Sequence, residues 1–266
     1  MTVKVSCLGP EGSYSELAAK KFFDGNSEIL LARNFSDVVE KLVCGEADTA
    51  VIPIENSIRG GVLQNLDLLE RCDVFAVEEA VLPIDHRLAM KKGVSFSDIK
   101  RIYSHEQAIG QCLGFLNRCL PRAQYIFTAS TAESLKKIDS ESAGIVGAHV
   151  KAGGIVLSRE NIADEKKNYT RFLRLVRGCE QPKAHSKMIF LCAVCEHQPG
   201  SLLHLLRIFA RYGRNLTRIE SRPMKGVFGE YRFFIELEGD ILDAEIQEML
   251  EAARSDCRQF RVLGAY

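Results

Sequence analysis

A hydroxyl and a cation stand side by side in the segment Asn168-Tyr-Thr170-Arg171-Phe172. Residues 169–176 are predicted to form a strand, in which successive side chains point to opposite faces. Thr170 and Phe172 then share one face and Arg171 points to the other, unless a bend at the strand end redirects it. A guanidinium beside a hydroxyl suits a carboxylate ligand that carries a reacting oxygen. The alternative is an exposed edge strand without chemistry.

Polar side chains also follow the earlier apolar run Val51-Ile-Pro-Ile54. Glu55, Asn56 and Ser57 come directly after it, and ligands favour the carboxyl ends of strands in open α/β sheets. Glu55 can donate a proton if burial raises its pKa. The alternative is that Asn56 and Ser57 only cap the turn before Gly60.

Two segments have the spacing of a helix start that can hold an anion. Ser13 with Glu16 fits the Ser-x-x-Glu capping box, and Ser104 with Gln107 forms a second box. Free N–H groups at helix starts bind anions. Gln111 lies one turn past Gln107 on the same helix face. Each segment is also compatible with a capped turn that binds nothing.

The first 180 residues alternate between short apolar strands and helical patterns, which is typical of parallel sheets with helices on both faces. Strands are predicted at 3–8, 29–33, 49–54, 101–103, 124–127 and 144–147, and helices at 16–23, 37–44, 62–71, 106–116 and 131–138.

Two extended stretches interrupt this alternation. Residues 74–89 are predicted to cross from one α/β lobe to another, and residues 155–170 are predicted to return. We therefore expect a first lobe of about 1–80 and 160–180 and a second lobe of about 81–159, together a domain of residues 1–180. Two lobes joined by two crossings leave a central cleft, where ligands commonly bind.

A polar linker, Gln181-Pro-Lys-Ala-His-Ser186, precedes a different pattern. Within 186–266 the order strand, helix, strand, strand, helix, strand is predicted, at 187–195, 200–212, 216–222, 229–237, 242–253 and 258–263. This βαββαβ order is the ferredoxin-like arrangement. A second, independent domain is therefore expected.

The composition is that of a soluble globular protein with no global charge. The chain has 266 residues, 35 basic and 35 acidic, and 46% are hydrophobic, which predicts more than one core and no field that attracts nucleic acid or a membrane. No signal peptide is recognisable, and no run approaches the ~18 apolar residues of a membrane span. The nine cysteines, among them Cys7, Cys44, Cys112 and Cys192, indicate reduced, buried thiols in a cytoplasmic protein.

Cys192-Ala-Val-Cys195 with His197 has the spacing of half a metal site. A strand is predicted there, however, and residues three apart in a strand face opposite sides. No second ligand pair follows in the sequence. Core cysteines are the better interpretation, so no metal is expected.

These motifs together resemble those of the prephenate dehydratase family. Four of them occur in the family's order: Gly9-Pro-Glu-Gly-Ser-Tyr-Ser15, Pro53-Ile-Glu-Asn-Ser57, Ser104-His-x-Gln107 with Gln111-Cys112, and Asn168-x-Thr-Arg-Phe172. Two later stretches resemble the signatures of its phenylalanine-binding ACT domain: Pro199-Gly-Ser-Leu-Leu203 and Asn215-Leu-Thr-Arg-Ile-Glu-Ser-Arg-Pro223. The resemblance covers essentially the whole chain.

The sequence departs from the family pattern at two places. Glu106 stands where the family commonly has proline, and Gly200-Ser-Leu-Leu203 stands where it often has Gly-Ala-Leu-Val. No mutase or dehydrogenase module is attached, so a monofunctional form is expected.

The resemblance implies a two-lobed catalytic domain like that of periplasmic binding proteins, and a lyase that converts prephenate to phenylpyruvate in phenylalanine biosynthesis without a cofactor. It also implies the site residues. The implied catalytic residues are Thr170, Glu55 and Arg171, and the implied substrate contacts are Ser13, Asn56, Ser57, Ser104, Gln107, Gln111 and Arg171. Thr170 would assist departure of the ring hydroxyl, and Arg171 would clamp a carboxylate.

For the ACT domain the resemblance implies feedback inhibition by L-phenylalanine and a homodimer or homotetramer formed through these domains. The implied effector contacts are Gly200, Ser201, Leu202, Asn215, Leu216, Glu220 and Ser221. The alternative is a dimerisation module without a ligand.

Two other functions stay open. An arogenate dehydratase would share all of these motifs, and the sequence does not separate it from a prephenate dehydratase. Two-lobed α/β clefts also serve as non-catalytic solute receptors. The missing signal peptide argues against a periplasmic receptor, and Thr170 beside Arg171 argues for chemistry.

Overall fold

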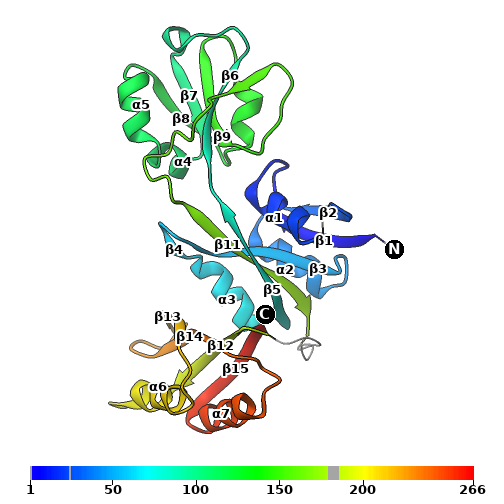
Figure 1. The fold of residues 1–266 in the computed structure, drawn as a ribbon, viewed down its shortest axis with the longest axis vertical. Coiled ribbons are helices and arrows are strands. Elements are labelled where there is room, and N and C mark those ends of the chain that lie inside the picture. The colour runs from blue at the N-terminus through cyan, green and yellow to red at the C-terminus, as the bar shows by residue number, and fades with distance from the viewer. Residues whose placement is uncertain (1, 24, 179–185) are drawn as a thin grey trace.

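The computed structural model describes residues 2–23, 25–178 and 186–266, and they form three stacked parts (Figure 1). We call residues 2–83 with 169–178 lobe 1, residues 84–168 lobe 2, and residues 186–266 the C-terminal domain. Lobe 1 lies in the middle, between lobe 2 and the C-terminal domain. Residues 181–185 of the predicted linker lie outside the described residues.

Lobe 1 contains the strand–helix alternation that the sequence predicts. Its elements are β1 (Val3–Leu8), α1 (Tyr14–Phe22), β2 (Ser27–Ala32), α2 (Phe35–Val43), β3 (Thr49–Asn56), β4 (Gly60–Gly61), α3 (Leu63–Arg71), β5 (Val74–Pro83) and β11 (Tyr169–Arg177). β1 pairs in parallel with β2 and β3. One core cluster packs beneath α1 and another beneath α2 and α3, so helices cover both faces.

The last strand of lobe 1 departs from the parallel arrangement. β11 runs antiparallel between β3 and β5, because the chain returns from lobe 2 in the opposite direction. Phe172 packs in the cluster beneath α1, whereas Leu173 packs in the cluster beneath α2 and α3. This alternation gives Thr170 and Arg171 different surroundings.

Lobe 2 is built around a mixed five-stranded sheet in the order β10-β6-β9-β7-β8. Its elements are β6 (His86–Lys91), η1 (Phe96–Asp98), β7 (Arg101–Ser104), α4 (Glu106–Gly110), α5 (Leu113–Cys119), β8 (Gln124–Phe127), η2 (Glu133–Lys137), β9 (Ser142–Gly147) and β10 (Ile155–Leu157). β7 pairs in parallel with β8 and β9, whereas β6 is antiparallel to β9 and β10.

The helix predicted at 106–116 is two helices in the structure. The carboxylate of Asp164 accepts hydrogen bonds from the backbone nitrogens of Gly114 (2.9 Å) and Phe115 (3.2 Å) and so caps a new helix start. Gly110 and Gly114 weaken a continuous helix at this point. The helix predicted at 131–138 is likewise shorter and has 3₁₀ geometry.

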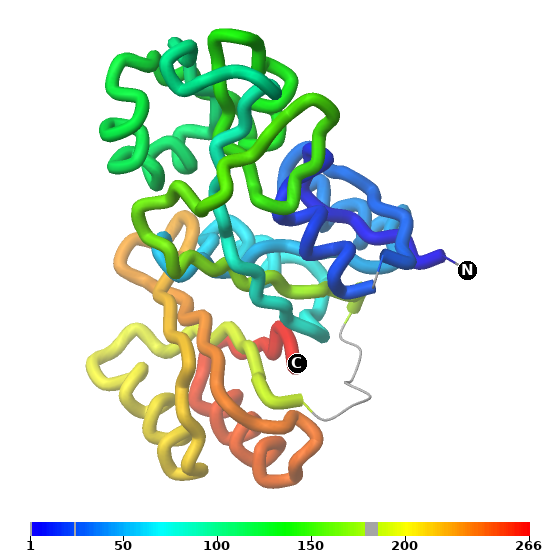
Figure 2. The backbone as a smooth tube through the Cα atoms, turned by 45° about the horizontal axis from the view of Figure 1, so that its top comes forward, coloured from blue at the N-terminus to red at the C-terminus, as the bar shows by residue number. Residues whose placement is uncertain are grey.

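Both predicted crossings between the lobes are present, and Figure 2 shows both segments passing between lobe 1 and lobe 2. The Ile84 nitrogen donates to the Asn168 carbonyl (2.8 Å), and the Ile162 nitrogen donates to the His86 carbonyl (2.8 Å). The two crossings are therefore hydrogen-bonded to each other at the junction of the lobes.

The C-terminal domain has the predicted βαββαβ order. Its elements are β12 (Met188–Cys195), α6 (Ser201–Arg211), β13 (Leu216–Pro223), β14 (Tyr231–Glu238), α7 (Ala244–Ser255) and β15 (Cys257–Ala265). The strand order is β13-β14-β12-β15, and α6 and α7 share a core with one face of this sheet.

The C-terminal domain has a core of its own and also packs directly against lobe 1. Phe190 and Phe234, on the face away from α6 and α7, belong to the same core cluster as Leu66 and Leu69 of α3. β15 also pairs in parallel with β5, at Gly264 opposite Ala76. A Cβ atom on Gly264 would lie 2.6 Å from the Ala76 Cβ, so this close approach requires glycine.

The cysteines are only partly buried. Cys44 and Cys119 are exposed, which corrects the expectation of buried thiols at position 44. Cys192 packs toward lobe 1 and Cys195 toward α6 and α7, so these two residues face opposite sides of β12, as predicted.

Among the described helices, none combines the length and the apolar character needed to cross a bilayer.

Candidate functional site

Thr170 lies at the start of β11, directly opposite Asn56 at the end of β3. The Asn56 Nδ2 donates to the Thr170 Oγ1 (2.9 Å) and to the Asn168 Oδ1 (2.7 Å). Because the threonine oxygen accepts this bond, its own proton is free to be donated to a ligand. The site thus holds a hydroxyl donor in a fixed position.

The orientation of Asn56 is itself fixed by the following turn. Its Oδ1 accepts hydrogen bonds from the backbone nitrogens of Ile58 (3.1 Å) and Arg59 (3.0 Å). The amide NH₂ group therefore has to face β11. The turn-capping role that the sequence left open for Asn56 is real, and it accompanies the contact with Thr170.

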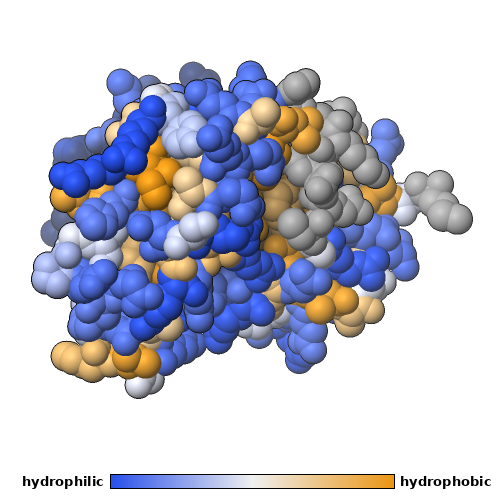
Figure 3. Space-filling view, turned by 90° about the horizontal axis from the view of Figure 1, so that it is seen from below, coloured by the Kyte–Doolittle hydropathy of each residue, from blue (hydrophilic) through white to orange (hydrophobic). Residues whose placement is uncertain are grey.

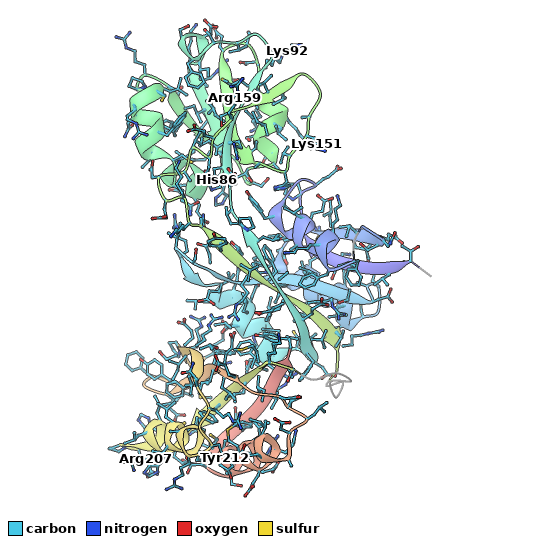
Figure 4. All side chains as sticks on the ribbon, in the orientation of Figure 1. His86, Lys92, Lys151, Arg159, Arg207 and Tyr212 are labelled. Carbon is cyan, nitrogen blue, oxygen red and sulfur yellow. The ribbon has the colours of Figure 1, made fainter. Side chains whose placement is uncertain are left out.

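Gln111 and His86 extend this amide cluster into lobe 2. The Gln111 Oε1 lies 3.4 Å from the Asn168 Nδ2 and 2.8 Å from the His86 Nε2. Asn168 is 2% exposed and His86 is 4% exposed. Burial lowers the pKa of His86, and the hydrogen bond to Gln111 opposes this only in part. Figure 4 labels His86 at the junction of lobe 2 with lobe 1.

The roles of His86 and Asn168 were missed in the sequence. Asn168 was visible as the first residue of its motif. His86 follows Pro83 in the predicted crossing and is the one histidine of that crossing. A polar residue in a segment expected to line a cleft was the available signal.

Arg171 points away from Thr170, which corrects the prediction that the two converge on one ligand. Its guanidinium makes a bidentate pair with Glu236 of β14, with distances of 2.6 Å (Nη1–Oε2) and 2.8 Å (Nη2–Oε1). It also lies 3.0 Å from Glu55 and 3.4 Å from Glu79. Although burial opposes the charge, the hydrogen bond to Glu236 raises the pKa of Arg171. Three carboxylates thus occupy the guanidinium that was expected to clamp a substrate carboxylate.

The side chain of Glu55 lies on the same face of the sheet as Arg171, because the two residues are opposite each other in the β3–β11 ladder. Its carboxylate is engaged with Arg171 on the face opposite to Thr170. The predicted catalytic trio is therefore divided. Thr170 stands in the amide cluster, and the other two stand in a group of charges at the C-terminal domain.

We call Arg171, Glu236, Arg218, Glu55 and Glu79 the interdomain charge cluster. The Glu236 side chain is 1% exposed and lies 3.7 Å from Arg218 as well, whose side chain is 7% exposed. This cluster joins the strand that carries Thr170 to β13 and β14 of the C-terminal domain. Ion pairs from α3 to β13 and β14 extend the contact, Asp67 with Arg222 and Glu70 with Arg232.

Ser104 is also placed differently from the prediction. It is fully buried, and its hydroxyl donates to the Ile145 carbonyl (2.8 Å) inside lobe 2. The predicted capping box does not form, because the His105 Nδ1 accepts from the Gln107 nitrogen and caps α4 instead. Ser104 thus holds β7 against β9, and its hydroxyl is not open to a ligand. The Gln107 side chain is exposed at this helix start.

The remaining two predicted substrate contacts lie in lobe 1. Ser13 caps α1 by accepting from the Glu16 nitrogen, and its hydroxyl donates to the Leu8 carbonyl (2.9 Å). Ser57 is exposed, and its hydroxyl accepts from the Tyr169 nitrogen (2.9 Å). Ser57 therefore ties the turn after β3 to the start of β11, next to Thr170.

A cavity of about 1130 Å³ opens between the two lobes. It is lined by the β1–α1 loop with Ser13 on one side and by lobe 2 residues such as His149 and Lys151 on the other. Lys151 extends from lobe 2 above α1 in Figure 4. The lining of this cavity includes Ser13 but, within the described ranges, neither Thr170 nor Gln111.

A second cavity, of about 420 Å³, lies at the start of α6 in the C-terminal domain. Ser201 and Leu202 line it, and Gly200 precedes them with φ 89°, a left-handed conformation that favours glycine. The other predicted effector contacts lie at β13, an edge strand of the sheet: Asn215, Leu216, Glu220 and Ser221. The Glu220 carboxylate faces Gly61 of lobe 1. Among the described residues that line this cavity, none belongs to the second signature stretch, 215–223.

The sequence matches the family described as prephenate dehydratase over residues 5–180 and the ACT domain over residues 190–254. It is 33% identical over 267 residues to the bifunctional chorismate mutase/prephenate dehydratase of Aquifex aeolicus, covering 99% of this chain and 73% of the relative. It is 31% identical to the prephenate dehydratase of Amycolatopsis methanolica, covering 99% and 88%. The crystal structure of prephenate dehydratase from Arthrobacter aurescens in complex with L-Phe has a TM-score of 0.90 at 32% identity, covering 99% of this chain and 90% of that chain.

Proposed function

Because the chain belongs to the prephenate dehydratase family, we propose that it is a lyase that converts prephenate to phenylpyruvate with loss of carbon dioxide and water. We assign the assisting hydroxyl to Thr170. The observation that carries this assignment is the hydrogen bond from the Asn56 Nδ2 to the Thr170 Oγ1 (2.9 Å). It leaves the threonine proton free for the departing ring hydroxyl.

The chemistry needs little more than orientation and one hydrogen bond. Loss of the carboxylate and the hydroxyl makes the ring aromatic, which supplies the driving force, so no electron sink is required. A threonine hydroxyl is a poor acid near neutral pH. It therefore acts as a positioned donor, and such assistance contributes roughly 10²–10⁴-fold to the rate.

The neutral surroundings of Thr170 suit this reaction. Its hydroxyl is bonded by the amide of Asn56, which continues through the amides of Asn168 and Gln111, and the guanidinium of Arg171 is on the opposite face of β11. The carboxylate that leaves as carbon dioxide must not be held too strongly, because that would stabilise the ground state more than the transition state. A site of amides around the leaving groups meets this requirement better than the arginine clamp that the sequence suggested.

We expect the protein to release phenylpyruvate when it is supplied with prephenate. The measurement is the absorbance of phenylpyruvate in one assay and the appearance of phenylalanine from arogenate in a parallel assay. Faster turnover of arogenate would make the protein an arogenate dehydratase. Tight binding without turnover of either compound would make it a receptor.

We further propose that L-phenylalanine binds the C-terminal domain and inhibits the enzyme. The cavity at the start of α6 supports this, because free N–H groups of the first helical turn would bind an amino acid carboxylate there. Two chains would pair through their C-terminal domains, so that β13 of one chain completes the cavity of the other. Exposed apolar side chains of this domain, such as Leu203 (50%) and Ile219 (46%), support such a contact.

Figure 3 looks at the molecule from the end of the C-terminal domain and shows separate hydrophobic areas on a mostly hydrophilic face. The number of chains in the assembly is testable by sedimentation, with a dimer or tetramer expected.

A cytoplasmic location completes the proposal, because the exposed thiols of Cys44 and Cys119 suit a reducing compartment.

Gly200→Val tests the effector site. Valine does not tolerate φ 89°, so the start of α6 must rearrange. We expect saturable heat from titration of the wild type with L-phenylalanine, and loss of both heat and inhibition in this variant with turnover kept. By linkage, prephenate must weaken phenylalanine binding by the same factor.

A matched control is Gly226→Val. Gly226 has φ 80° and lies between β13 and β14, outside the residues that line the cavity. This variant introduces the same backbone strain and should still bind L-phenylalanine. Absence of heat with the wild type would refute the effector proposal and leave the dimerisation module.

A further inference from the structure

We infer that His86 is a positioning residue of the dehydratase site, which fixes the side-chain amide of Gln111 so that its NH₂ group faces the substrate. This inference rests on the proposed site around Thr170. It assigns a role to a histidine that touches none of the reacting groups named above.

The backbone of His86 is anchored at the junction of the lobes. Its nitrogen donates to the Asn161 Oδ1 (3.2 Å), and its carbonyl accepts from the Ile162 nitrogen (2.8 Å). Both partners belong to the returning crossing. With 4% of the residue exposed, the ring has little freedom to turn, so its contact with Gln111 is set by the fold.

The direction of every hydrogen bond in the amide cluster follows from the turn after β3. Backbone nitrogens of Ile58 and Arg59 are donors, so the Asn56 Oδ1 must face them and its Nδ2 must face Asn168. The Asn168 Oδ1 then accepts from Asn56 (2.7 Å), and its Nδ2 is directed at Gln111. Each amide fixes the orientation of the next.

The same logic fixes Gln111 and His86. The Gln111 side-chain oxygen must face the Asn168 Nδ2 (3.4 Å), and the same oxygen lies 2.8 Å from the His86 Nε2. An amide oxygen only accepts, so the Nε2 of His86 carries the proton. Two donors on one oxygen hold the amide in a single orientation.

Two polar atoms are left over by this arrangement. The Gln111 Nε2 and the His86 Nδ1 are buried and have no hydrogen-bond partner among the described residues. A buried donor without a partner is costly. Prephenate carries two carboxylates and a hydroxyl, all of which accept hydrogen bonds, so any of these groups would satisfy the Gln111 NH₂ when the substrate binds beside Thr170. A flipped amide would present an oxygen to a dianion and repel it.

Burial also keeps the ring in the form that this role needs. The pKa of His86 is lowered, first because the ring is buried. Near neutral pH the ring is therefore uncharged and has one N–H, which the hydrogen-bond directions place on Nε2. Its neighbour Asp85 is occupied by Arg87 (2.5 Å).

The test compares His86→Leu with His86→Gln. Leucine removes the donor, whereas the glutamine amide places an N–H near the position of the imidazole Nε2. We expect His86→Leu to raise KM for prephenate roughly 10- to 100-fold, the range for a lost hydrogen bond to a charged group. His86→Gln should restore KM to within about threefold of the wild type.

A double-mutant cycle separates a role through Gln111 from general packing. In a Gln111→Leu background, His86→Leu should change KM little further. An equal loss in both backgrounds, or a His86→Gln variant no better than His86→Leu, would overturn the inference. Circular dichroism and thermal unfolding of each variant show whether it folds.

A measurement on the wild-type protein needs neither turnover nor a variant that folds poorly. The ¹⁵N chemical shifts of the histidine ring report which nitrogen carries the proton, and the His86→Gln variant identifies the His86 signal by its absence. We expect the Nε2-protonated tautomer. An Nδ1-protonated ring would overturn the inference, whereas a wild type inactive on prephenate with the expected tautomer would overturn only the proposed function.

Discussion

Replacing Thr170 by valine is expected to lower kcat for prephenate by roughly 10²–10⁴-fold, the range of assistance by a positioned proton donor, with little change in KM. Valine has nearly the same shape as threonine and lacks only the hydroxyl. The amide of Asn56 keeps its bonds to the Asn168 Oδ1 and the Tyr169 carbonyl, so the cluster should stay in place. The measurement is steady-state kinetics with prephenate.

Two further variants sharpen this test. Thr170→Ser keeps the hydroxyl and should keep most of the turnover. Thr49→Val makes the same chemical change at the start of β3, the end of that strand farther from Asn56. The Thr49 hydroxyl donates to the Leu175 carbonyl (2.6 Å). This variant should lower the free energy of unfolding by about 1 kcal/mol and leave kcat unchanged. An unchanged turnover number in Thr170→Val would remove this residue from the mechanism.

Most elements of the fold follow from local patterns. Strands β1 and β8 have the bounds predicted from their alternation, and the βαββαβ order of the C-terminal domain is as expected. The helix at 106–116 was predicted as one because its break depends on Asp164, which lies 50 positions from Gly114. A contact over that distance leaves no trace in local periodicity.

The candidate site, like the fold, could be predicted where local patterns decide it and not where distant contacts do. The alternation of a strand predicted that Thr170 and Arg171 face opposite sides, and the structure agrees. The resemblance instead placed both on one substrate, because it carries residue identities without their partners. Glu236, 65 positions away, decides where the guanidinium goes. The bond between His86 and Gln111 was equally hidden, since it joins a crossing of the chain to the end of a helix.

The ion pair of Arg171 with Glu236 connects the C-terminal domain directly to the strand that carries Thr170. Glu236 lies on β14, beside the edge strand β13 that carries one of the two effector signatures. Thr170 and Arg171 are neighbours in one strand, so a displacement of β14 must move both. The interdomain charge cluster thus provides a direct contact between the domain of the proposed effector site and the strand that carries Thr170.

Glu236→Gln is therefore expected to destabilise the protein and to weaken inhibition. The substitution leaves the guanidiniums of Arg171 and Arg218, 17% and 7% exposed, without their buried carboxylate. Breaking a buried ion pair costs about 3–5 kcal/mol, and Glu55 and Glu79 reduce this toward about 3 kcal/mol. Urea unfolding measures the loss.

The matched control is Glu238→Gln, two residues further along β14, where the side chain is exposed. It makes the same change of charge in the same strand and should leave the free energy of unfolding within about 0.5 kcal/mol. If the cluster transmits the effector signal, Glu236→Gln keeps binding L-phenylalanine in calorimetry while turnover becomes less sensitive to it. Inhibition as strong as in the wild type, in a variant measurably less stable, would mean that the cluster holds the domains together and that the signal travels through another contact.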